Sequence, residues 1–178
     1  MANYCNPAVI RPWYRVAMSP TPQHNEFVNQ LLASKDFFER STRVLEEADS
    51  EFRPQPDMMT AAQQVAHVAQ TLDWFVEGVS RPEGFDLNFE EHAKALQAVK
   101  SLAAARQMLE KAYANAIQYF GAKSAEEMAR PLPPGPIMGG QPTSGVVWGM
   151  IEHTAHHRGA LTVYSRQLGK VPVMPYMG

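Results

Sequence analysis

Residues 151–159 read IEHTAHHRG and set His153 and His157 four positions apart. Residues four apart share one face of a helix, with their Cβ atoms about 5–6 Å from each other. The same face of the predicted helix carries a stripe of further side chains: Val146, Met150, Ala160, Leu161, Tyr164 and Leu168. The stretch therefore predicts an amphipathic helix that turns both imidazoles toward the core, where they can converge on one ion.

Two interpretations of this pair stay open at the level of sequence. Partly buried histidines that are satisfied by hydrogen bonds produce the same spacing, and for an arbitrary i, i+4 pair this is the commoner case. The apolar stripe shifts the balance toward coordination, because two imidazoles side by side in a core are costly unless something binds them. His67, far upstream in another helix-like segment, could add a third nitrogen. Three neutral imidazoles and one open position form a coordination set that catalytic zinc uses.

Prolines divide the rest of the chain into windows in which helices can form, because proline is excluded from helix interiors. Helix start signals occur at Thr21-Pro22, at Thr60 with Gln63, at Asn88 with Glu91, and at Pro142-Thr143-Ser144. The proline-free windows are 23–53, 57–81, 83–130 and 143–171. Four long amphipathic segments with no clear strand candidate predict an all-α fold, most simply a four-helix bundle.

Two smaller features complete this organisation. Ser124 and Glu127 have the spacing of a capping box, which predicts a short extra helix near 124–130. The linker 131–142 is rich in proline and glycine, so we expect it to be irregular and to cross one end of the bundle.

Composition narrows the classes of function. The chain of 178 residues is 45% hydrophobic and carries a formal charge of −2, with no basic block, so neither nucleic acid nor a membrane surface is an expected partner. The N-terminus lacks the features of a signal peptide, and no apolar run is long enough to span a bilayer. Cys5 stands alone, which fits a reducing compartment. We therefore expect a cytoplasmic protein, with Cys5 as a free thiol.

The run from His153 to Leu161, followed by Tyr164, Leu168-Gly169 and Val171-Pro172, resembles the DinB-like superfamily, which includes the YfiT-like metal-dependent hydrolases. The resemblance extends to His67 within QVAHVA at 64–69, with Trp74 after it. It implies an up-down-down-up four-helix bundle at 21–172, between an N-terminal arm at 1–20 and a tail at 173–178. It also implies a homodimer and a divalent metal ion, zinc or nickel, held by His67, His153 and His157.

Periodicity by itself places His67 differently. At 100° per residue it lies more than a right angle from the stripe of its segment, on the face of Gln64, Thr71 and Trp74. A ligand at the rim of a cleft would reconcile the two, and His67 is assigned as a ligand mainly from the resemblance. His24 and His92, near the starts of their predicted helices, are interpreted as surface residues.

The resemblance and the histidines together leave two classes of function. The first is a metal-dependent enzyme, either a hydrolase or a transferase of a low-molecular-weight thiol, acting on a small-molecule substrate. The second is a metal-stabilised stress-response or binding module without turnover. Glu152 and His156 are candidates for a general base, although each fits a structural role as well. Neither the zinc-peptidase pattern His-Glu-x-x-His nor a Glu-x-x-His pair is present, which argues against zinc-peptidase and di-iron chemistry.

Overall fold

The computed structural model describes residues 23–177, and the side chains from Glu26 onward. The predicted arm at 1–20 with Cys5, the start signal at Thr21-Pro22 and the side chain of His24 lie outside this part. In chain order the elements are α1 (Gln23–Thr42), the 3-10 helix η1 (Glu47–Asp49), α2 (Ala61–Ser80), α3 (Phe89–Gln97), α4 (Leu102–Gly121), α5 (Ala125–Ala129) and α6 (Ser144–Gln167).

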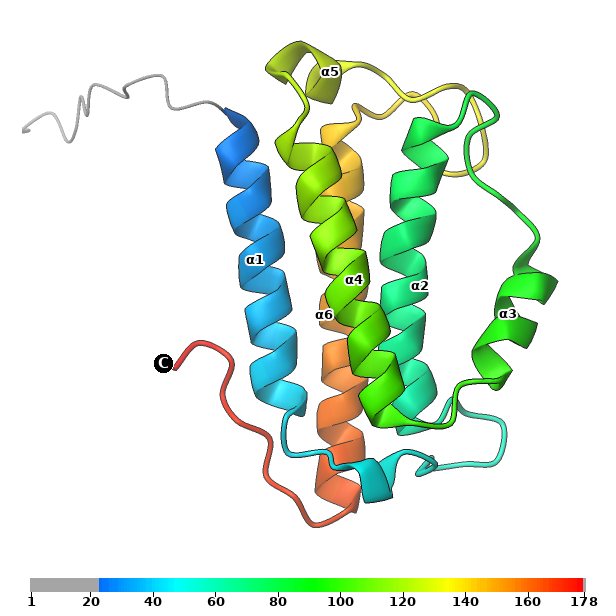
Figure 1. The fold of residues 1–178 in the computed structure, drawn as a ribbon, viewed down its shortest axis with the longest axis vertical. Helices are drawn as coiled ribbons and strands as arrows, with labels where there is room; N and C mark the ends of the chain where they lie inside the picture. Colours follow the sequence, from blue (N-terminus) through cyan, green and yellow to red (C-terminus); the bar gives the residue numbers. More distant parts are fainter. Residues whose placement is uncertain (1–22, 178) are drawn as a thin grey trace, which may run out of the picture.

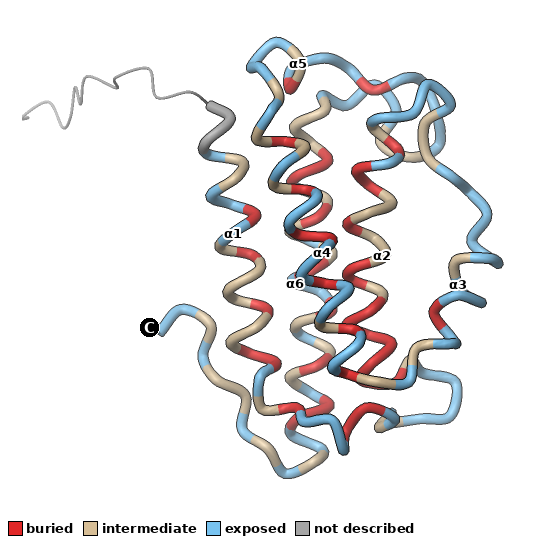
Figure 2. Tube along the Cα trace, viewed as in Figure 1, coloured by how far each residue is buried: buried red, intermediate tan, exposed pale blue. Residues whose placement is uncertain are grey.

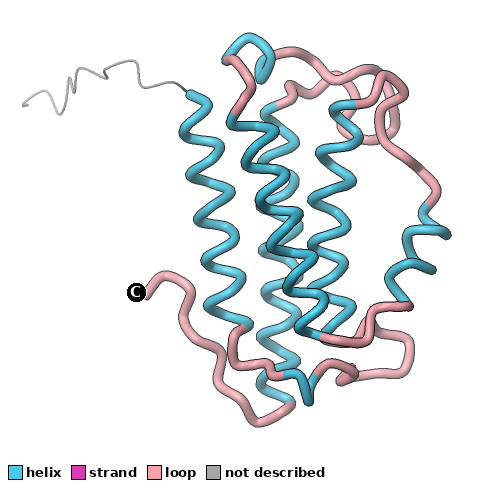
Figure 3. Tube along the Cα trace, in the orientation of Figure 1, coloured by secondary structure: helices cyan, strands magenta, loops and turns pink. Residues whose placement is uncertain are grey.

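Four long helices, α1, α2, α4 and α6, stand side by side (Figure 1). Following the colours along the chain, α1 and α6 run in one direction and α2 and α4 in the other. Between residues 23 and 177 there are helices and loops and no strand (Figure 3). An isolated antiparallel bridge joins Pro131 to Pro142 in the linker before α6. The predicted all-α class is confirmed. None of the described helices is both long enough and apolar enough to cross a lipid bilayer.

Local capping signals set several helix starts. The Thr60 hydroxyl accepts from the Gln63 amide at 3.2 Å while Gln63 Oε1 accepts from the Thr60 amide at 2.9 Å, so the predicted capping box of α2 is present. Ser124 and Glu127 form the same reciprocal pair at α5. The Asn88 side chain caps α3 in one direction, because it accepts from the Glu91 amide at 3.4 Å without a returning bond.

The proline-free window 83–130 is more divided than its sequence suggested, since α3 and α4 are separate helices. Ser101 caps the start of α4 by accepting from the Ala104 amide at 3.1 Å, and side chains from the connection between α1 and α2 satisfy two further amides. The Leu102 amide donates to Ser50 Oγ at 2.9 Å, and the Ala103 amide donates to Glu47 Oε2 at 2.8 Å. These acceptors satisfy amides that have no partner within the helix, which favours a new helix start at this point.

Buried residues occur along all four long helices (Figure 2), and the apolar ones form one hydrophobic cluster, the core. Tyr113 of α4 is fully buried, and its hydroxyl bonds to Ser34 Oγ of α1 at 3.1 Å and to Thr154 Oγ1 of α6 at 3.3 Å. A buried hydroxyl with two partners costs little to desolvate and links three helices at one point. The largest fully buried side chains are Tyr113, Tyr164, Phe38, Phe120, Leu31, Leu72, Leu102, Leu109 and Met150.

Candidate metal centre

Helices α2 and α6 bring three histidines together in the bundle: His67 from α2, and His153 and His157 from α6. One ligand nitrogen of each ring lies within 4.8 Å of the others. The ring centroid of His67 is 5.0 Å from that of His153 and 4.8 Å from that of His157. Among the described residues this group contains these three histidines and no further cysteine or carboxylate. All three residues predicted as ligands are thus neighbours in space.

The geometry of the α6 pair suits a shared ion. His153 Nε2 and His157 Nε2 are 3.2 Å apart. Two nitrogens at about 2.0–2.1 Å from a tetrahedral ion are about 3.3 Å from each other, so the pair needs little adjustment. An N–H···N hydrogen bond fits the same separation. The third ring favours a shared ion over a hydrogen-bonded pair of histidines. His67 Nδ1 is buried without a hydrogen-bond partner, and a buried polar atom normally has one.

A series of hydrogen bonds orients His157 through the ring nitrogen that faces away from the other histidines. Its Nδ1 donates to Gln64 Oε1 at 2.5 Å, which leaves the Nε2 lone pair directed at the other histidines. Gln64 Nε2 donates in turn to the Tyr164 hydroxyl at 3.3 Å, and that hydroxyl donates to the Met59 carbonyl at 2.9 Å. Each buried group in this series therefore has a partner, and His157 is held in one tautomer.

Burial keeps the three imidazoles neutral. Together with the neighbouring histidines, whose effect is smaller, burial lowers the pKa of His157 from 6.5 to about 3 and that of His153 to about 4. The pKa of His67 is lowered as well, chiefly by burial. Neutral rings present free lone pairs at pH 7, and this is the donor set that a divalent ion of the zinc type accepts. The residues present therefore fit such an ion.

His67 occupies the position that reconciles periodicity with the resemblance. It is half-buried, while Val65 and Val68 on the apolar stripe of α2 are fully buried. Gln64 was grouped with the polar face in the sequence, yet it is 7% exposed because α6 covers it. Sequence reasoning therefore missed Gln64 as the residue that orients His157. Its position three residues before His67 was the available signal, since i and i+3 lie on neighbouring parts of a helix.

A cavity of about 240 Å³ opens beside the cluster, between α2, α3 and α6. Two of the three histidines reach it, together with polar and aromatic side chains. Its lining residues are His67, Gln70, Thr71, Trp74, Phe75, Phe89, His92 and His153. His92 is thus not simply a surface residue: its side chain is 28% exposed, and its Nε2 lies 3.4 Å from Asp86 Oδ2. His92 is partly buried because α3 packs against α2, and Gln70 Nε2 donates a hydrogen bond to the His92 carbonyl at 3.0 Å.

The two candidates for a general base lie outside this cavity. Glu152 and His156 are both exposed, and neither lines the cavity wall. The His156 ring is 5.0 Å from the ring of His157, so it borders the cluster from the solvent side.

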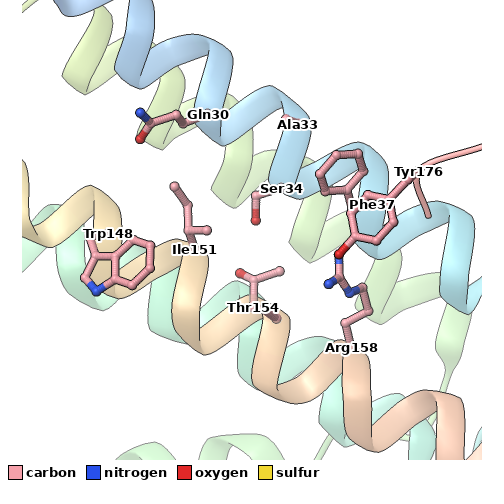
Figure 4. A pocket seen from close by; sticks show the side chains of 10 residues that line it. Gln30, Ala33, Ser34, Phe37, Trp148, Ile151, Thr154, Arg158 and Tyr176 are labelled. Atoms are coloured by element: carbon pink, nitrogen blue, oxygen red, sulfur yellow. The ribbon is translucent and has the colours of Figure 1, made fainter. Parts of the chain in front are cut away.

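A second cavity, of about 420 Å³, lies between α1 and α6 and is lined by a different face of α6 (Figure 4). Trp148 and Ile151 stand near one end, while Arg158 lies near Phe37 and Tyr176 at the other. None of the three clustered histidines lines this groove.

Comparison with known proteins places the chain in a family. The model of the DinB family matches residues 18–178, which is nearly the whole chain. This chain belongs to the DinB family. No curated protein matched this DinB family member.

Two solved structures share the fold of this DinB family chain. A DinB-like protein from Bacillus cereus ATCC 10987 is 16% identical with a TM-score of 0.66, and the match covers 86% of this chain and 97% of that one. A DinB-like protein from Bacillus subtilis is 13% identical with a TM-score of 0.61, covering 84% of this chain and 96% of the other. These likenesses support the DinB-like helical fold.

Proposed function

We propose that this DinB family protein is a metal-dependent enzyme in which His67, His153 and His157 hold a divalent ion, zinc or nickel. The observation that carries the proposal is a cluster of three neutral imidazoles beside a cavity that two of them reach. When bound, an ion with three neutral ligands keeps its positive charge and lowers the pKa of a water or thiol, supplying a nucleophile near neutral pH. We infer hydrolysis, or transfer of a low-molecular-weight thiol, with a small electrophile as substrate.

The surrounding residues have distinct roles in this proposal. Gln64 fixes the tautomer of His157 through Nδ1, the ring nitrogen that faces away from the other histidines. Thr71 Oγ1 lies 3.4 Å from His153 Nε2, the nitrogen that would coordinate the ion, so this contact belongs to the metal-free site. His92 is the cavity-lining titratable side chain outside the cluster, and with Asp86 nearby it can take up or release a proton. It suits the role of proton carrier better than Glu152 or His156, because both of these lie outside the cavity.

Metal analysis of protein purified without a histidine tag tests the site. One equivalent of a divalent ion per chain is expected, and replacing His67, His153 or His157 with alanine should sharply reduce it. His156→Ala is the matched control, since it removes an exposed imidazole next to the cluster and should leave the metal content unchanged. Undiminished metal binding in the triple variant would overturn the proposed site.

Turnover tests the enzymatic part separately. Glutathione, bacillithiol and mycothiol would be offered with electrophilic substrates, alongside ester and amide substrates without thiol. We expect activity that a chelator abolishes and added metal restores. Activity that survives exhaustive chelation would contradict a metal-dependent mechanism. Metal binding without turnover of any of these substrates would favour the metal-stabilised module instead.

A further inference from the structure

We propose that the cavity beside the three histidines recognises a flat, uncharged apolar group of the substrate, such as a phenyl ring. This assigns a substrate class to the cavity and rests on the proposed function for its link to the histidines. The recognition itself depends on the protein wall, so it can be measured without the ion.

Aromatic side chains build that wall. The Trp74 ring centroid lies 5.2 Å from Phe75 and 6.3 Å from Phe89, both of which line the cavity. Behind it, Phe85 packs against Trp74 at 4.7 Å and against Phe75 at 6.0 Å. These separations fall in the range of favourable ring contacts, so one more ring could join the cluster on its open side.

The wall is held in place before any ligand arrives. Trp74 Nε1 donates to the Asp86 carbonyl at 2.7 Å, which fixes the indole from the connection that leads to α3. Gln70 Nε2 donates to the His92 carbonyl at 3.0 Å, which ties α3 itself to α2. A wall that is already ordered loses little conformational entropy when a ligand binds.

One part of the wall remains largely exposed to solvent. Phe89, the first residue of α3, is 56% exposed although it lines the cavity. Covering an exposed ring with a second ring removes apolar area from water on both surfaces, and this drives association.

The cavity also indicates what it would reject. Its lining contains no lysine, arginine, aspartate or glutamate, and its polar groups come from Gln70, Thr71 and the histidines. A charged group entering it would lose water without meeting an opposite charge. A dry cavity of about 150 Å³ is enough for benzene, so about 240 Å³ accommodates one ring with a short connecting chain.

The wall can be tested first in the metal-free protein. Benzyl alcohol would be titrated while the indole N–H signals of Trp74 and Trp148 are followed by NMR, with propan-1-ol as the aliphatic probe. Benzyl alcohol should shift the Trp74 signal and bind about fivefold tighter than propan-1-ol. Phe89→Ala removes an exposed side chain, so the fold should persist, and binding should weaken about fivefold. Trp148→Ala, in the groove between α1 and α6 (Figure 4), is the matched control and should change nothing.

The zinc-loaded protein then separates this proposal from the proposed function. Benzohydroxamate and acetohydroxamate carry the same metal-binding group, and the phenyl compound should bind at least about tenfold tighter, an advantage that Phe89→Ala reduces. Equal binding of the two hydroxamates, or a benzyl alcohol response at Trp148 in place of Trp74, would overturn the aromatic site. If neither hydroxamate binds but benzyl alcohol still shifts Trp74, the aromatic site stands and the open metal site fails.

Discussion

Substituting leucine for Gln64 removes the acceptor that His157 uses while keeping a side chain of similar size. Gln64 is 7% exposed, so water does not readily replace it, and the Nδ1–H of His157 is left buried without a partner. An unsatisfied buried donor costs about 1–3 kcal/mol. The Tyr164 hydroxyl loses the bond from Gln64 but still donates to the Met59 carbonyl at 2.9 Å, so it adds little to the cost of the substitution. The free energy of unfolding should therefore fall by about 1–3 kcal/mol.

The same substitution should weaken metal binding, because His157 loses the bond that fixes its tautomer. Loss of such a supporting bond lowers metal affinity about 10–100-fold, equivalent to about 1.4–2.7 kcal/mol. Urea unfolding of the metal-free protein measures the first effect, and competition with a chromophoric chelator measures the second. Both assays belong near pH 7.5, where the histidines are neutral.

Gln64→Glu is the control, since a carboxylate oxygen can still accept from His157 Nδ1–H. It should recover most of the metal affinity that Gln64→Leu loses. The reasoning would be refuted if the leucine variant bound metal within twofold of the wild type and unfolded at the same urea concentration.

Three further predictions follow from the fold and the site. Because burial lowers the pKa of His153 to about 4 and that of His157 to about 3, the unfolded chain binds more protons below pH 6.5. The free energy of unfolding of the metal-free protein, measured with urea, should thus fall by roughly 1–2 kcal/mol for each pH unit below 6.5, after allowance for partial exposure of the two rings. The same pH dependence in a variant with alanine at both His153 and His157 would contradict this. Thr60→Ala should cost about 1 kcal/mol through the lost α2 cap, and Thr60→Ser should restore it in the same assay. Metal at a hundredfold excess over Kd should add about 2.7 kcal/mol to wild-type stability in a thermal melt, and nothing to the triple variant that also lacks His67.

The parts of the fold that were predictable from sequence are those fixed by neighbouring residues. Two capping pairs act within one helical turn: Thr60 with Gln63, and Ser124 with Glu127. Their spacing in the sequence therefore predicted the starts of α2 and α5. The break between α3 and α4 was missed although Ser101 caps α4 locally, by accepting from the Ala104 amide at 3.1 Å. The Leu102 amide is satisfied by Ser50, more than fifty residues upstream, and this second contribution leaves no trace in the local pattern.

In the candidate site, too, the predictable residues are those related by local spacing, and the others depend on contacts between distant segments. His153 and His157 share a helix face at a spacing of four, so their proximity could be predicted, whereas periodicity alone placed His67 away from the core. Gln64 becomes buried when α6 packs over α2, and His92 joins the cavity when α3 folds back. Both events depend on contacts between segments distant in sequence, which periodicity within one segment does not record.

The three histidines come from α2 and α6, and the described part of α1 contributes none of them, although α1 packs against α6 and α4. An ion bound there would clamp two of the four long helices and leave α1 free to open as a separate unit. In native-state hydrogen exchange, metal should slow the amides of α2 and α6 and leave those of α1 nearly unaffected. Loading the site would thus raise the protection of α2 and α6 relative to that of α1.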